Sequence, residues 1–113
     1  RQRALVVLLT ALEPSAIADG LLPVLPALTR HHRVVLASVR DPELGHLADV
    51  SATDRPTADA VYDAAAAEHE LERRARMEEV LARLGVDVVD ADAAQLPPAL
   101  ADHYLHLKAQ GLL

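Results

Sequence analysis

The chain contains no cysteine, tryptophan or phenylalanine, and aromatic residues make up only 2% of its 113 residues. Without cysteine it has no disulfide, no thiol nucleophile and no thiolate metal ligand. The scarcity of aromatic rings leaves little stacking surface for nucleobases or sugars. Hydrophobic residues nevertheless make up 51% of the chain, so the core must be aliphatic, built from leucine, valine, isoleucine and alanine.

Basic residues are in the minority, with 11 Lys and Arg against 17 Asp and Glu and a formal net charge of −6. A nucleic-acid binder needs a basic footprint for the phosphate backbone, so we exclude nucleic acid as a partner. No run approaches the roughly 20 apolar residues of a membrane-spanning helix, and we expect no signal peptide. We therefore expect a cytoplasmic chain that makes no membrane contact of its own.

Three short aliphatic runs predict strands. Residues 5–9 (LVVLL) are typical of a strand buried on both faces, at the centre of a parallel sheet. Residues 34–39 and 86–90 repeat the pattern, and helical segments separate the three runs. The sequence therefore predicts an α/β fold, a three-layer Rossmann-like parallel sheet of about three strands with flanking helices. The length indicates a single domain, residues 1–113.

The first and last helical segments have defined patterns. One glycine and two prolines interrupt the segment 14–28, which predicts a kinked helix or two short helices that meet near Leu22. After two consecutive prolines, a final helix is expected to place Leu100, Tyr104 and Leu107 on one face.

Two further helices are expected between the second and third strands. Asp41 and the proline after it predict a short helix, which Gly45 should end early. The longest helix is expected to begin near Thr57 and to stop at Gly85. Its apolar face comprises Leu71, Met77, Leu81 and Leu84. Charged residues from 68 to 83 include Glu–Arg pairs at four-residue spacing, which is typical of a solvated helix face.

The chain begins at Arg1 without a methionine, directly before the first predicted strand. We expect it to be a fragment of a longer protein, or a processed form of one.

Four stretches of the sequence carry a family resemblance. They are residues 5–13 (LVVLLTALE), 34–44 (VVLASVRDPEL), 85–90 (GVDVVD) and 104–109 (YLHLKA). On these stretches the chain resembles the C-terminal half of a von Willebrand factor A-type domain, and more narrowly domain-of-unknown-function family fifty-eight. Its bacterial members are often encoded beside MoxR-type AAA+ ATPases. The resemblance implies a partial A-type fold, an interaction role with such an ATPase as partner, and a parent protein that can be membrane-anchored.

The metal site of complete A-type domains has no counterpart in this sequence. That site combines an early Asp-x-Ser-x-Ser motif with a threonine and a later aspartate at the carboxyl edge of the sheet. The early motif does not occur here, and Ala11 stands where the resemblance places the aspartate. A divalent cation needs clustered oxygen ligands, and Glu13 is the nearest substitute. We assign the chain no metal and no cofactor.

Polar residues follow the predicted strands at what should be one edge of the sheet, where doubly wound folds bind ligands. The residues expected to line this edge are Thr10, Glu13, Ser38, Arg40, Asp41 and Asp90. For Arg40 and Asp41 a helix cap with a local ion pair is the simpler interpretation, and a contact for a protein partner is the functional one. Asp87 is expected inside its strand and Asp90 in the loop that follows.

The histidines do not predict a metal site. Two of the six lie in the polar turn 29–33. His103 and His106 stand three residues apart on the last helix, and no carboxylate near them in the sequence completes a ligand set.

No enzyme motif is present. A phosphate-binding loop needs glycines directly after a strand, and the first glycine after Leu9 is Gly20. The sequence thus favours a non-enzymatic protein-interaction module, and a small nucleotide- or flavin-binding α/β domain is the alternative. If the strand that flanks residues 5–9 in a complete domain is missing, their backbone edge stays open. We then expect a homodimer through the first strand, formed by Leu5, Val6, Val7, Leu8 and Leu9.

Overall fold

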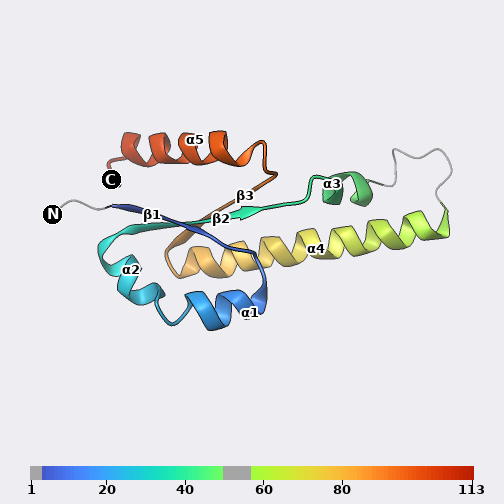
Figure 1. Ribbon diagram of the computed structural model, residues 1–113, viewed down its shortest axis with the longest axis horizontal. Coiled ribbons are helices and arrows are strands. Elements are labelled where there is room, and N and C mark those ends of the chain that lie inside the picture. The colour runs from blue at the N-terminus through green and yellow to red at the C-terminus, as the bar shows by residue number, and fades with distance from the viewer. Residues whose placement is uncertain (1–3, 50–56) are drawn as a thin grey trace.

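The computed structural model describes residues 4–49 and 57–113, which form an α/β fold around a three-stranded, all-parallel sheet (Figure 1). The strands are β1 (Leu5–Leu9), β2 (Arg33–Val39) and β3 (Val86–Ala91), in the spatial order β1-β2-β3. The predicted fold class is confirmed, and each predicted strand lies within two residues of its expected bounds.

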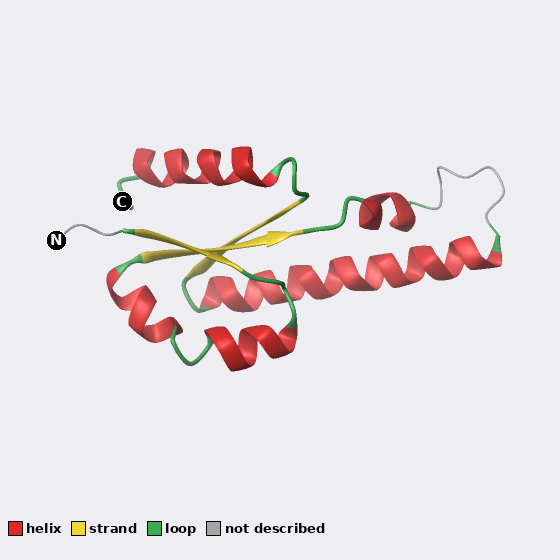
Figure 2. Cartoon of the chain, viewed as in Figure 1, coloured by secondary structure: helices red, strands yellow, loops and turns green. Residues whose placement is uncertain are grey.

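Helices cover both faces of the sheet. They are α1 (Pro14–Ala16), a π-helical turn η1 (Ile17–Leu21), α2 (Leu25–His31), α3 (Glu43–Ala48), α4 (Ala58–Arg83) and α5 (Leu96–Ala109). The helices that connect the strands, α1 with η1, α2 and α4, lie on one face, and α5 lies on the other (Figures 1 and 2). This is the arrangement that same-handed crossovers produce in a sheet whose strands follow one another in order.

The prediction that residues 5–9 form the central strand is wrong. The centre is β2, whose residues 34–38 are all buried. Strand β1 lies at the edge, where Val7 and Leu9 are 42% and 74% exposed. Both strands are aliphatic runs, so composition does not distinguish them. The two strands differ in their exposure because β2 has a neighbouring strand on each side, whereas β1 has only one. In addition, α5 packs mainly on β3 and β2.

The main core lies between the sheet and the connecting helices. It comprises Leu12, Ile17, Leu21, Leu25, Val34, Leu36, Leu81 and Val86, with Val6, Leu8, Leu28, Met77 and Val88 packed against it. The strand residues in this set have even numbers, because alternate side chains point to opposite faces. Odd-numbered strand residues therefore face α5, whose Leu96 and Leu107 are buried.

Several helix ends have the local causes that the sequence indicated. The first helical segment breaks between η1 and α2, at residues 22–24. Thr57 caps α4, its Oγ1 accepting a hydrogen bond from the backbone N–H of Ala60 at 3.1 Å. Gly85 has φ of +85°, the left-handed conformation in which glycine ends helices at little cost.

Three details of the helices differ from prediction. Helix α3 continues past Gly45 to Ala48 because it packs on α4, and a glycine costs only about 1 kcal/mol within a helix. At the end of α4, Leu84 is 45% exposed. Tyr104 is also exposed, with the Lys108 ammonium 5.6 Å from its ring.

None of the helices described is long and apolar enough to cross a membrane.

Candidate functional site

The carboxyl ends of the strands meet at one edge, as parallel pairing requires. Ser38 and Asp90 are register partners on β2 and β3; Ser38 is buried, and so is the side chain of Asp90. Asp90 therefore lies inside β3, and its predicted place in the following loop is wrong. The backbone N–H of Thr10 donates to Ala37 O at 3.1 Å, and that of Arg40 donates to Ala91 O at 2.8 Å, so both continue the ladders past the strand ends.

The other two predicted edge residues are exposed. Asp41 Oδ1 accepts a hydrogen bond from the backbone N–H of Glu43 at 3.0 Å, which confirms its role at the start of α3. Glu13 places Oε1 3.5 Å from Arg73 Nη2, with its side chain 60% exposed. The edge thus has a buried polar layer, Ser38 with Asp90, and an outer charged layer formed by Glu13, half-buried Arg40 and Asp41.

Arg74 of α4 neutralises the buried layer. Its Nη1 donates to Asp90 Oδ1 at 2.8 Å and lies 3.5 Å from Ser38 Oγ. The Asp90 side chain is only 2% exposed and that of Arg74 15%. Among the residues described, Asp90 Oδ2 has no hydrogen-bond partner. The carboxylate at the centre of the edge is thus held by an arginine on the same chain.

Arg73, the neighbouring residue, ties α4 to the loop after β1. Its Nη1 donates to the backbone O of Leu12 at 2.7 Å, and its Nε donates to Glu70 Oε2 at 2.8 Å. The hydrogen bond from Arg73 lowers the pKa of Glu70, and the charges of Arg73 and Arg74 lower it further against the opposing effect of burial. This clamp sets the position of Glu13 at the edge.

The interpretation of residues 68–83 as a solvated face holds for Arg76 and Glu72, which lie 4.0 Å apart at the surface. It is wrong for Arg73 and Arg74. A signal for Arg74 was present in the sequence, because it precedes Met77 by three residues and Leu81 by seven. At 3.6 residues per turn this spacing places it on the predicted apolar face.

Glu78 lies close enough to Asp90, Arg40 and Arg74 for their charges to affect its pKa. Burial raises its pKa from the ordinary value of 4.5, and the charge of Asp90 raises it further, against the charges of Arg40 and Arg74. The folded chain therefore binds this proton more tightly than the unfolded chain does. The associated stability is complete below pH 4.5 and is lost as the pH rises through the raised pKa of the folded state.

Replacing Glu78 with glutamine should remove this pH dependence. We expect Glu78→Gln to be more stable than the wild type at neutral pH, and this advantage to disappear below the unfolded pKa. Urea unfolding on both sides of that window would measure the difference, with exposed Glu79→Gln as the matched control. Equal stability of Glu78→Gln and wild type at neutral pH would contradict the assignment.

A second polar cluster lies on the α5 face of the sheet. Arg33 donates to both carboxylate oxygens of Asp87, at 3.0 and 3.1 Å, and His103 Nε2 lies 3.1 Å from Asp87 Oδ2. The sequence analysis did not indicate this carboxylate partner of His103, and one carboxylate beside one histidine does not make a metal-ligand set. Asp87 is 54 residues from Arg33 and 16 from His103, so only the fold brings the three together. The cluster anchors α5 to the sheet.

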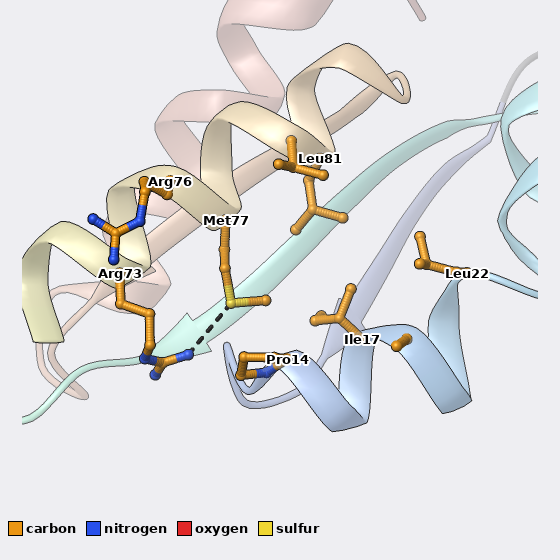
Figure 3. A pocket seen from close by; sticks show the side chains of 9 residues that line it. Pro14, Ile17, Leu22, Arg73, Arg76, Met77 and Leu81 are labelled. Carbon is orange, nitrogen blue, oxygen red and sulfur yellow. Dashed lines mark hydrogen bonds between the residues drawn. The ribbon is translucent and has the colours of Figure 1, made fainter.

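An apolar groove runs between the first helical segment and α4 (Figure 3). We call it the α1–α4 groove; its lining residues are Pro14, Ile17, Ala18, Leu22, Arg73, Arg76, Met77, Val80 and Leu81. Ile17 and Met77 point toward one another across it (Figure 3). Its volume is about 250 Å³, below the roughly 300–1,000 Å³ typical of pockets for whole small-molecule ligands.

Within residues 4–49 and 57–113, no group of three or more His, Asp or Glu residues could hold a metal ion. Neither the edge nor the Asp87 cluster offers the several free oxygen ligands that a divalent cation takes. Compared with known proteins, the chain matches no family model, no curated protein and no solved structure.

Proposed function

We propose that the chain is a non-enzymatic protein-interaction module, related to the C-terminal half of a von Willebrand factor A-type domain of domain-of-unknown-function family fifty-eight. It docks its partner on the carboxyl edge of the sheet. One observation carries this proposal: the buried carboxylate of the edge, Asp90, is paired with Arg74, while charged side chains lie above it at the surface. An edge neutralised from within suits polar contacts to a protein better than ligation or proton transfer.

A MoxR-type AAA+ ATPase is the first partner to test, because the family resemblance implies it. We expect the Arg40→Glu variant to bind such an ATPase about tenfold more weakly than the wild type, since it reverses a charge in the outer layer. Biolayer interferometry with the purified ATPase would measure this. Arg30→Glu, in α2 before the start of β2 and so away from the carboxyl edge, is the control. Equal loss in both variants would contradict docking at the edge.

The alternative, a nucleotide- or flavin-binding domain, gains little support from the site. The loop after β1 contains buried Leu12 and acidic Glu13 where a phosphate would need backbone amides. A rise in melting temperature with nucleotides or flavins would nevertheless favour it over the interaction module. Hydrolase or transferase activity of the isolated chain would contradict the non-enzymatic proposal directly.

The outer edge of β1 supports the proposed homodimer. Thr10 N–H and Ala4 C=O are bonded to β2, so even-numbered residues direct their backbone groups inward. The alternation of a strand then directs the N–H and C=O of Leu5, Val7 and Leu9 outward. A second copy can pair with this row in antiparallel orientation across a two-fold axis, giving a six-stranded sheet.

Val7→Pro should block this pairing without breaking the β1–β2 ladder, because the N–H it removes points outward. Val7→Thr keeps the N–H and the branched side chain and serves as the control. We expect light scattering to give a lower mass for Val7→Pro than for Val7→Thr at each concentration. A wild-type chain that stays monomeric would show that the three strands need no partner.

A further inference from the structure

Helix α4 is strongly divided in charge. Its residues 58–72 contain five acidic side chains and no Lys or Arg, whereas residues 73–83 contain four arginines and two glutamates. The first half therefore carries −5 of a chain whose net charge is −6. Such a helix is complementary to a copy of itself that runs in the opposite direction.

The acidic half of α4, residues 58–72, has large hydrophobic side chains exposed at its surface. It packs on α3 through buried Ala64 and Ala67 and extends with α3 away from the sheet (Figure 1). Tyr62, which helical spacing places roughly opposite buried Ala64, is 77% exposed, and its neighbour Val61 is 51% exposed. Tyr62 is the most exposed of the large hydrophobic side chains described.

The basic half borders the α1–α4 groove. Val80 lines the groove and is 51% exposed, and Leu22 on the opposite side is 38% exposed. Of the two arginines in the lining, Arg73 is engaged by Glu70 and Leu12. The Arg76 side chain is 60% exposed, and its ion pair with Glu72 spans 4.0 Å. The groove is thus apolar, with an available cation at its rim.

We propose that two copies of the chain associate through antiparallel α4 helices, the Tyr62 ring of each entering the α1–α4 groove of the other. A cavity of about 150 Å³ holds a benzene ring, so the groove, at about 250 Å³, has room for one phenol side chain. It has less room than a nucleotide or a flavin needs.

The spacing along α4 makes the contact reciprocal. A two-fold axis beside residue 71 sets Tyr62 against Val80 of the second copy, nine residues either side of the axis. The same symmetry sets Arg76 opposite Ala66, within one helical turn of Glu68. Both grooves are filled at once, and the antiparallel helix dipoles add a favourable term. The contact uses neither β1 nor the carboxyl edge, so it is independent of the proposed function.

The absence of cysteine allows a direct test of this geometry. In an Ala58→Cys/Leu84→Cys variant, the two positions are 26 residues apart along one helix, about 39 Å. A disulfide tolerates at most about 7 Å between Cα atoms, so a 58–84 bond can form only between copies. We expect mild oxidation to give a dimer joined by 58–84 disulfides, identified by peptide mapping. Tyr104→Cys/Leu84→Cys is the control pair.

Substitutions in the proposed contact should change the yield of the 58–84 disulfide dimer in a defined way. Adding Tyr62→Ser should abolish the cross-link, whereas Tyr104→Ser, which removes the other tyrosine, should leave it unchanged. Arg76→Glu should reduce it, and Glu68→Arg with Glu72→Arg should restore it in the same chain. The yield should persist with Val7→Pro, which blocks β1 pairing, and should fall as salt is raised.

Three results would overturn the proposal: a 58–84 yield no higher than that of the control pair, no effect of Tyr62→Ser, or loss of the cross-link with Val7→Pro. The last result would assign self-association to β1 alone. Circular dichroism of each variant separates a lost contact from a lost fold.

Discussion

Replacing Arg74 with methionine is expected to lower the free energy of unfolding by about 3–5 kcal/mol, the cost of leaving a buried charge without its partner. The side chain of Asp90 is 2% exposed, and Arg74 is its ion-pair partner at 2.8 Å. Domains of this size are typically stable by about 5–15 kcal/mol, so the variant should lose a large part of its stability. Urea denaturation, monitored by circular dichroism, would measure the loss of stability.

Two further variants make this experiment decisive. Arg76→Met, on the exposed side of the same helix, should change stability by no more than about 0.5 kcal/mol. Arg74→Met combined with Asp90→Val should be more stable than Arg74→Met alone, because replacing both members of a buried pair avoids the unpaired charge. If Arg74→Met unfolds at the same urea concentration as wild type, the pair does not stabilise the edge.

The second large effect is expected from Leu12→Ala. Leu12 is 1% exposed in the main core, and truncation of such a leucine costs about 2–5 kcal/mol through lost burial and the cavity left behind. Its backbone O also receives the hydrogen bond from Arg73 at 2.7 Å. The substitution should therefore loosen the loop that carries Glu13 as well as the core.

Thermal and urea unfolding would give the size of this effect, and hydrogen exchange at residues 10–13 would report the loop. Leu105→Ala is the matched control, because Leu105 is 61% exposed on α5. We expect that control to stay within about 0.5 kcal/mol of wild type. A similarly small change in Leu12→Ala would mean that the loop after β1 is not anchored through the core.

The family resemblance stays a proposal, and its most direct test is binding to a MoxR-type ATPase. The proposed carboxyl edge uses residues that the sequence already indicated: Glu13, Arg40 and Asp41 at the surface, with Ser38 and Asp90 below them. Parallel strands bring their ends together by geometry, so this grouping could be predicted from the strand assignments. The arginine that neutralises Asp90 could not be assigned with the same certainty, because it lies in a run of charges on α4.

By itself the sequence determined the features with local causes. Three aliphatic runs separated by helical segments specify three parallel strands, the Thr57 cap and Gly85 delimit α4, and the prolines break the first helical segment. Each depends on the backbone preferences of a few adjacent residues. Only the tertiary structure decided which run is central, because β1 and β2 are alike in composition and differ in the number of their neighbours. It also decided the environments of Arg74 and His103, whose carboxylate partners lie 16 residues away along the chain. Such pairs depend on how the crossovers return the chain to the sheet, and local residue patterns do not encode that distance.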